Sequence, residues 1–165
     1  LPFLMASNVH PNAKGSFVGI SVGHTRRHLL RSVYEGIAFC HRYHTEKLLA
    51  TRTEPPKCIR LAGGAANSPV WTQMFADILQ LPVQTVAANE TGALGCAIAS
   101  AVAVGDYPDL SAAAMCRISE AVNPRPEYRE VYDRKYALYR KTIECLDPLW
   151  SEMQSVIDAS GKTAD

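Results

Sequence analysis

One stretch of the chain, residues 58–69, decides the fold, and it reads Cys58-Ile59-Arg60-Leu61-Ala62-Gly63-Gly64-Ala65-Ala66-Asn67-Ser68-Pro69. Its first five residues form a compact, mostly apolar run, which is typical of a short buried strand. The glycine pair indicates a tight turn directly after that strand. Ser68 and Pro69 then supply an N-cap and a first-turn proline, the usual start of a helix. The stretch therefore predicts a strand, a glycine turn and a helix in direct succession.

The residues that follow repeat this alternation. Apolar side chains at helical spacing continue the helix through Val70, Met74, Ile78 and Leu81, and Val83, Thr85 and Val86 indicate a second short strand. Asn89 is placed to cap a third helix, with Glu90 in its first turn, and Gly105 is placed to end it. A β-α-β-α order predicts an α/β domain with parallel strand pairing.

The segments before this unit are predicted from the same signals. Prolines and asparagines indicate an irregular entry loop over residues 1–14, and the run 15–21 (GSFVGIS) resembles a short strand. Thr25 can cap a long amphipathic helix that ends near Leu49, with apolar positions at Leu30, Val33, Ile37, Cys40 and Leu48.

After residue 105 the sequence becomes mostly helical. Ser111 can cap a short helix through Met115, and a tyrosine-rich helix follows Pro126. Asp147-Pro148 should break that helix before a last one over 149–157. We therefore expect a folded part over residues 1–157 and a disordered tail over 158–165.

Length and composition exclude several functional classes. A chain of 165 residues can bury a core as one domain, and its formal net charge of +1 offers no basic stripe for nucleic acid. The longest apolar run, residues 93–104, is too short and too rich in Ala and Gly to cross a membrane. Leu1 is an unusual first residue, from which we expect a truncated start.

The five cysteines favour a cytoplasmic protein. They stand singly at Cys40, Cys58, Cys96, Cys116 and Cys145, in an odd total and without a C-x-x-C pair. This distribution suits a reducing compartment better than a disulfide framework. We expect small buried thiols rather than redox or metal ligands.

The glycine turn is the best candidate binding site in the sequence. Residues 62–66 carry at most a methyl side chain, so a ligand can lie against the backbone, and the helix that follows offers free amides to a polar or anionic group. The alternative is a tight turn that binds nothing. The turn matches neither G-x-x-x-x-G-K-[ST] nor G-x-G-x-x-G, which disfavours a P-loop or a dinucleotide site.

Other candidate features are weaker. The glycines and alanines of residues 91–97 predict an unusually close contact for that helix, in the core or with a ligand. His24, His28, His41 and His44 lack the further ligands of a zinc site, so we read them as structural or surface residues. No serine nucleophile motif or pair of carboxylates frames a catalytic centre.

Three motifs together resemble the FGGY family of carbohydrate kinases. The run Gly15-Ser16-Phe17-Val18-Gly19-Ile20, a gap of seven residues, and His28-Leu29-Leu30-Arg31-Ser32-Val33-Tyr34-Glu35 match the family's C-terminal signature at every position. The run from Gly63 to Trp71 is similar to the family's Gly-Gly-Gly-Ala-Lys-Ser-Pro-x-Trp loop. Glu90 to Ala97 resembles its acid-x-x-Ala-Leu-Gly-x-Ala helix, so the resemblance extends from Leu1 to about Tyr139.

This resemblance implies a ribonuclease H-like, actin-like ATPase domain, incomplete at its N-terminal end. Family members transfer the γ-phosphoryl of ATP, with Mg²⁺, to a hydroxyl of a sugar or polyol. By analogy, ATP would rest on Gly63, Gly64, Ala65 and Ser68. Ala65 replaces the family's third glycine and Asn67 its lysine, which puts a side-chain contact from position 67 in doubt.

The resemblance also implies what this chain lacks. The family's catalytic aspartate, Mg²⁺ ligands and most sugar contacts lie in an N-terminal domain, so we expect no catalytic or metal residue here and no activity of the chain alone. Residues 2–8 lack the family's Gly-Glu-Arg and look more like a ketopentose kinase of the L-xylulose kind than a glycerol kinase. The alternative is a non-catalytic actin-like module that binds nucleotide or a partner. A homodimer is a further open expectation.

Overall fold

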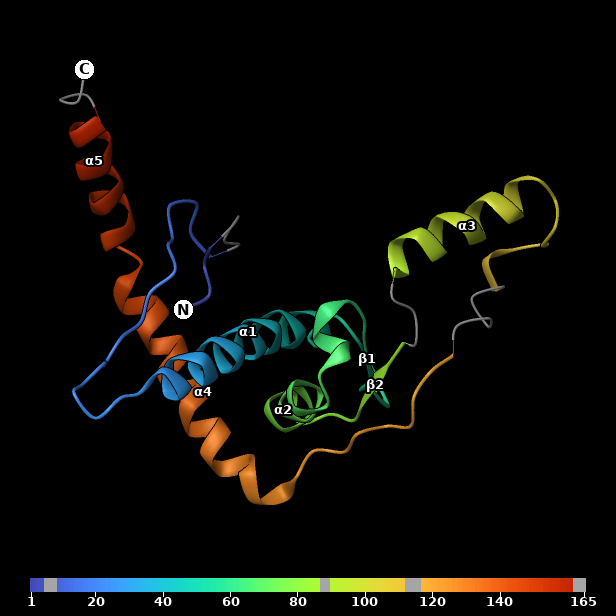
Figure 1. Cartoon of the computed structure of the whole chain (residues 1–165), viewed down its shortest axis with the longest axis horizontal. Helices are drawn as coiled ribbons and strands as arrows, with labels where there is room; N and C mark the ends of the chain where they lie inside the picture. Colours follow the sequence, from blue (N-terminus) through green and yellow to red (C-terminus); the bar gives the residue numbers. More distant parts are fainter. Residues whose placement is uncertain (5–8, 87–89, 112–116, 162–165) are drawn as a thin grey trace. The chain divides into compact units, whose positions relative to one another are not determined.

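The computed structural model describes residues 1–4, 9–86, 90–111 and 117–161, and it shows an α/β chain (Figure 1). The chain divides into two compact units. Unit 1 combines Leu1–Lys47 with Glu130–Asp165, and unit 2 is Leu48–Arg129. The chain enters unit 2 at the end of one helix and leaves it at the start of another, so no linker in the sequence indicates the division.

Unit 2 contains the predicted strand, turn and helix. Strand β1 (Ile59–Leu61) pairs in parallel with β2 (Val83–Thr85), and Ile59 lies opposite Val83. A 3-10 turn, η1 (Gly64–Asn67), and helix α2 (Pro69–Leu79) connect the two strands. The α/β order, the parallel pairing and the position of α2 are thus confirmed.

Helix α2 and strand β2 hold the apolar core of this unit. Phe75, Ala76, Ile78 and Val83 are almost fully buried. A third chain segment lies along the other edge of β2, where Val83 forms an antiparallel bridge with Val122 and Val86 one with Ile118. This edge segment adds hydrogen bonds to β2 beyond the two-stranded ladder.

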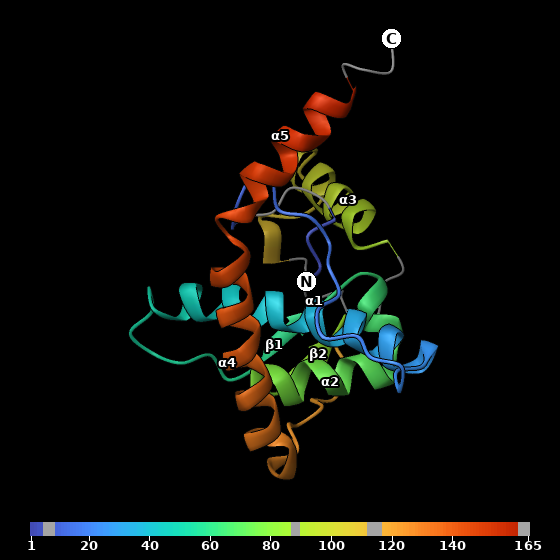
Figure 2. The same cartoon turned by 90° about the vertical axis from the view of Figure 1, so that its left-hand side faces the viewer.

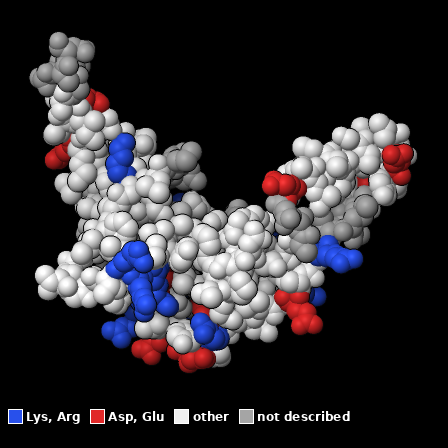
Figure 3. Space-filling view, in the orientation of Figure 1, with Lys and Arg blue, Asp and Glu red and all other residues white. Residues whose placement is uncertain are grey.

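Helix α3 (Thr91–Ala103) begins and ends close to the predicted residues, but its packing differs from the expectation. None of its residues is buried, and a Cβ added at Gly92 or Gly95 would meet nothing within 4 Å. Charged atoms appear only near its ends (Figure 3). Within the described part of the chain, the expected close contact in the core is therefore wrong at the two glycines, and a contact with a ligand stays a prediction.

One of the predicted helix caps falls on a residue whose structure is not described. Asn89 lies outside the described residues, and the cap position before α3 is Glu90, whose side chain makes no capping hydrogen bond. The helix predicted to start at Ser111 also extends into undescribed residues. Gly105, with φ of 87°, follows the end of α3 as predicted.

Unit 1 is built on two long helices that cross each other (Figures 1 and 2). They are α1 (Arg26–Leu49) and α4 (Arg129–Leu146), and a short turn, η3 (Pro126–Tyr128), precedes α4. Phe39 of α1 packs against three tyrosine rings of α4 at centroid distances of 5.5–6.2 Å: Tyr132, Tyr136 and Tyr139. The predicted tyrosine-rich helix therefore supplies the core of this unit.

Helix α5 (Leu149–Gly161) follows the predicted break at Asp147-Pro148. It continues four residues into the segment for which a disordered tail was expected. Of the described cysteines, Cys40 and Cys58 are partly buried, and Cys96 and Cys145 are exposed free thiols. The expectation of buried thiols is thus wrong for the last two, which lie on the outer surfaces of α3 and α4.

Residues 15–21 form no strand, contrary to the prediction. The side chains of Phe17, Val18 and Ile20 are more than half exposed. A strand needs a neighbouring strand to pair its backbone groups, and among the described residues this segment is paired in that way only at Ser16, with Leu1. Apolar alternation alone therefore misled the prediction here.

Candidate functional site

The candidate site is the glycine turn between β1 and α2 in unit 2. Gly63 has φ of 81° and ψ of −164°, a backbone conformation that is essentially restricted to glycine. This geometry turns the chain sharply away from β1 and starts η1, which Ala66 N closes by donating to the Gly63 carbonyl at 3.0 Å. The backbone itself therefore explains the glycine at position 63.

The glycine at position 64 needs a different explanation. Its φ lies outside the left-handed region, and a Cβ built on it would meet nothing within 4 Å. Neither conformation nor packing in the described chain thus requires glycine at this position. Open space beside an exposed backbone is what a closely bound ligand needs.

Ser68 fixes the start of α2. Its Oγ accepts a hydrogen bond from Trp71 N at 3.3 Å, and Pro69 occupies the first helical turn. These are the predicted N-cap and N1 proline. The cap orients the N-terminus of the helix, which carries a partial positive charge.

Three main-chain donors of this turn and of the start of α2 are free of protein partners among the described residues. Within the part of the chain that the structure describes, the N–H groups of Gly64, Ala65 and Val70 form no hydrogen bond to protein atoms. They belong to η1 and to the first turn of α2, and Gly64 and Val70 are exposed. Free amides at a helix start form a binding site for a polar or anionic group such as a nucleotide. The structure places Gly63, Gly64, Ala65 and Ser68 on one turn, and their role in binding a nucleotide stays a prediction.

An ion pair between a buried carboxylate and an exposed arginine links α2 to the segment at the far edge of β2. Asp77 on α2 is 1% exposed, and it accepts hydrogen bonds from Arg125 N at 2.9 Å and from Arg125 Nη2 at 2.6 Å. Gln73 Nε2 donates to Asp77 Oδ1 and to the Asn123 carbonyl, both at 3.0 Å. Sequence reasoning missed this contact because 48 residues separate its two partners.

The Arg125 guanidinium also stacks 4.1 Å from the centroid of Tyr128. The Asp77 carboxylate raises the pKa of Arg125 through its hydrogen bond and its charge, so the guanidinium stays charged. A polar residue in the third turn of an otherwise apolar helix was the only available signal for it. This pair fixes the base of α2, at the opposite end from the glycine turn.

The histidines have local structural roles rather than a shared ligand. His28 Nδ1 accepts from Thr25 N at 3.1 Å, and His24 Nδ1 accepts from Ser21 N at 2.9 Å. Burial lowers the pKa of His41, with a smaller contribution from His44. In residues 1–4, 9–86, 90–111 and 117–161, no three His, Cys, Asp or Glu side chains gather as a metal site would require.

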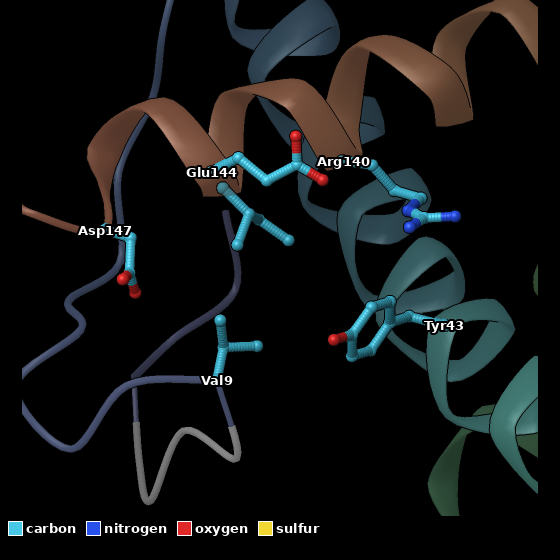
Figure 4. A pocket seen from close by; sticks show the side chains of 6 residues that line it. Val9, Tyr43, Arg140, Glu144 and Asp147 are labelled. Carbon is cyan, nitrogen blue, oxygen red and sulfur yellow. The ribbon is translucent and has the colours of Figure 1, made fainter.

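Unit 1 contains a separate polar cavity of about 290 Å³ (Figure 4). Figure 4 shows Arg140 and Glu144 on α4 and Asp147 just after its end, facing Tyr43 of α1 and Val9 of the entry loop. Its mixed charges match no motif in the sequence. The glycine turn, with its free main-chain donors in the described part of the chain, is the better candidate. Among the described helices, none is long and apolar enough to cross a lipid bilayer.

Comparisons with known proteins show which family this chain matches. The family model described as the C-terminal domain of FGGY carbohydrate kinases matches residues 2–104. The L-xylulose/3-keto-L-gulonate kinase of Escherichia coli is 34% identical over 148 residues, which are 88% of this chain and 30% of that protein. A glycerol kinase of Pseudothermotoga lettingae is 35% identical over 127 residues, or 75% of this chain and 26% of that protein.

A solved structure gives the same answer for the fold. The xylulose kinase of Rhodospirillum rubrum superposes with a TM-score of 0.70 at 34% identity, over 84% of this chain and 28% of that one. The fold is thus the actin-like, ribonuclease H-like type of these kinases. The chain spans about 30% of the length of the relatives that it matches.

Proposed function

Because this chain belongs to the FGGY family of carbohydrate kinases, we propose that it is the ATP-binding portion of an enzyme that phosphorylates a sugar hydroxyl. The reaction would transfer the γ-phosphoryl of ATP to the acceptor. The observation that carries the proposal is the set of unpaired amides at Gly64, Ala65 and Val70 beside the open face of Gly64, all within the described part of the chain.

Each residue of the turn has a role in this proposal. Gly63 gives the backbone its turn, and Gly64 and Ala65 let the nucleotide approach and donate to it. Ser68 orients the helix start, whose partial charge favours the phosphate side of the nucleotide. Asn67 is exposed and carries no charge, so the electrostatic attraction here comes from the backbone alone.

The described residues do not provide the ligands of a Mg²⁺ site. They gather no cluster of three His, Cys, Asp or Glu side chains, and the turn itself contains no carboxylate. We therefore propose that the metal ligands and the catalytic base come from the rest of a longer parent enzyme, and that this chain alone is inactive. Phosphoryl transfer depends on positioning around those groups.

For the acceptor we propose a ketose, with a pentulose such as L-xylulose favoured over a polyol. Support comes from the Ser7-Asn8 entry in place of Gly-Glu-Arg, and from the wider match to the E. coli L-xylulose/3-keto-L-gulonate kinase. The glycerol kinase match is similar in identity but shorter, so identity does not separate the acceptors. We also propose a cytoplasmic location, which suits the free cysteines.

Calorimetric titration with ATP and Mg²⁺ tests the nucleotide site. Gly64→Trp should weaken ATP binding at least tenfold because the indole would occupy the ligand's space. Gly95→Trp is the matched control, since Gly95 also has open space around it but lies on α3. If ATP bound equally well to wild type and Gly64→Trp, the turn would not be the site. For the acceptor, the full-length parent enzyme should phosphorylate L-xylulose faster than glycerol or erythritol.

A further inference from the structure

The cavity of about 290 Å³ in unit 1 takes no part in the proposed nucleotide site (Figure 4). Tyr43 of α1, the end of α4 and Val9 of the entry loop line it. Its volume is at the small end of the range of ligand pockets, which suits a small metabolite better than a nucleotide. The chemistry of its lining therefore needs an explanation of its own.

The charged side chains of this cavity are available to a ligand. In the described part of the chain, the side chains of Arg140, Glu144 and Asp147 form no hydrogen bond or ion pair with protein atoms. By contrast, Arg42 of α1 binds Asp133 of α4 at 2.8 Å. Arg140 and Glu144 are exposed and Asp147 is half-buried, so a ligand reaches all three from solvent. Unpaired charges of both signs around one cavity favour a ligand with complementary charges.

The three charges follow one another along α4. Glu144 is about one helical turn from Arg140, and Asp147 is about two turns from it. The Asp147 N–H donates to the Ile143 carbonyl at 3.0 Å, which continues the helical path to this residue. At about 1.5 Å per residue, Arg140 and Asp147 are roughly 10 Å apart along the axis. Figure 4 shows the Glu144 carboxylate between them, extended toward Arg140. A positive group thus lies at one end of the cavity, and negative groups occupy the middle and the other end.

The rest of the lining distinguishes the two ends further. Val9 and the buried side chain of Ile143 give the cavity an apolar part. Tyr43 lies on the side toward Arg140, and its hydroxyl has no hydrogen-bond partner among the residues described (Figure 4). The Lys47 ammonium lies 4.3 Å from the centroid of the Tyr43 ring and adds positive charge to that end. This end therefore suits a carboxylate.

We propose that this cavity binds a free amino acid with a basic side chain, of the size of lysine. Its carboxylate pairs with the Arg140 guanidinium, whose planar fork matches a carboxylate. Its α-ammonium pairs with Glu144 and its side-chain ammonium with Asp147. The alkyl stem between them lies against Val9 and Ile143. The charges of the ligand then complement those of the lining one by one.

The same lining disfavours related molecules. A diamine places a cation beside Arg140, where it is repelled. An amino acid with an apolar side chain leaves the Asp147 carboxylate without a partner and removes its solvent. Selectivity for a dibasic amino acid thus needs all three charges.

Calorimetric titration of the chain with L-lysine tests the proposal, together with analogues that each lack one charged group. L-norleucine lacks the side-chain ammonium, ε-aminocaproate lacks the α-ammonium, and cadaverine lacks the carboxylate. Each analogue should bind at least tenfold more weakly than L-lysine. If L-norleucine bound as tightly as L-lysine, or if L-lysine showed no binding, the proposal would be wrong.

Two variants assign the contacts at the two ends. Arg140→Gln should weaken binding of L-lysine at least tenfold without weakening cadaverine, and Asp147→Asn should weaken L-lysine without weakening L-norleucine. Arg134→Gln is the matched control, because Arg134 is exposed on the same helix but does not line the cavity. Circular dichroism checks that each variant keeps its helices. Folded variants that weakened both ligands alike, or an equal loss in Arg134→Gln, would overturn the assignment.

Discussion

The two neighbouring glycines of the candidate site should respond oppositely to the same substitution. Gly63 has φ of 81° and ψ of −164°, where a Cβ is strained whatever the space around it. Gly64 has an ordinary φ, and a Cβ at this position would meet nothing within 4 Å. We therefore compare Gly63→Ala with Gly64→Ala in otherwise identical chains.

The expected magnitudes follow from backbone energetics. Holding a non-glycine residue in the Gly63 conformation costs about 1–3 kcal/mol. At Gly64 alanine fits without strain and restricts the unfolded chain, which stabilises by about 0.4–1 kcal/mol. The free energies of unfolding of the two variants should thus differ by about 1.5–4 kcal/mol, with Gly63→Ala the less stable.

Urea unfolding followed by tryptophan fluorescence measures this difference. The two tryptophans lie in different units, Trp71 in unit 2 and Trp150 in unit 1. In a Trp150→Phe background, the signal of Trp71 reports unit 2, which contains the turn. With a slope of about 1–3 kcal/mol per molar urea, the midpoint of Gly63→Ala should fall by roughly 1 M.

Equal destabilisation by both substitutions would refute the reasoning, since it would mean that Gly64 is also required by the protein's own packing. An unchanged midpoint in Gly63→Ala would show that the turn does not hold its left-handed conformation. A change in slope rather than midpoint would instead indicate an altered unfolded state.

Three further predictions concern the supports of the two units. Asp77→Asn should lower the free energy of unfolding of unit 2 by about 1.5–3 kcal/mol, because it weakens the buried charged acceptor of Arg125 N. If the urea midpoint of this variant were unaffected, water would have to reach the carboxylate. Ser68→Ala should cost about 1 kcal/mol through the lost cap of α2, and Ser68→Asp should restore most of it. Burial, and then the hydrogen bond to Glu46, raise the pKa of Tyr136. A phenol with a raised pKa stabilises the fold fully below the unfolded value of about 10 and loses that contribution as pH rises above it. Unit 1 should therefore unfold in alkali together with tyrosine ionisation, followed by ultraviolet absorbance, and Tyr136→Phe should move that transition to higher pH.

Local signals in the sequence were enough for the strand, turn and helix of the candidate site. The apolar run before Gly63, the Ser68 cap and Pro69 act within a few residues, so the neighbouring chain decides the structure they adopt. The tyrosine spacing after Pro126 was equally local, and the helix that it indicated is α4. The family signature at residues 15–35 gave the class of fold independently of these elements.

The remaining features depend on partners that are distant in sequence. Residues 15–21 have the pattern of a strand, yet a strand exists only where another backbone pairs with it. The small residues of α3 indicate close packing, but only the tertiary structure shows that none of them is buried and that open space surrounds Gly92 and Gly95 in the described part of the chain. The bond between Asp77 and Arg125 spans 48 residues, and no periodicity connects its partners. The sequence by itself thus determined the glycine turn and its helix, because their hydrogen bonds are local. The tertiary structure alone decided which edges and faces are paired, because those contacts depend on the path of the whole chain.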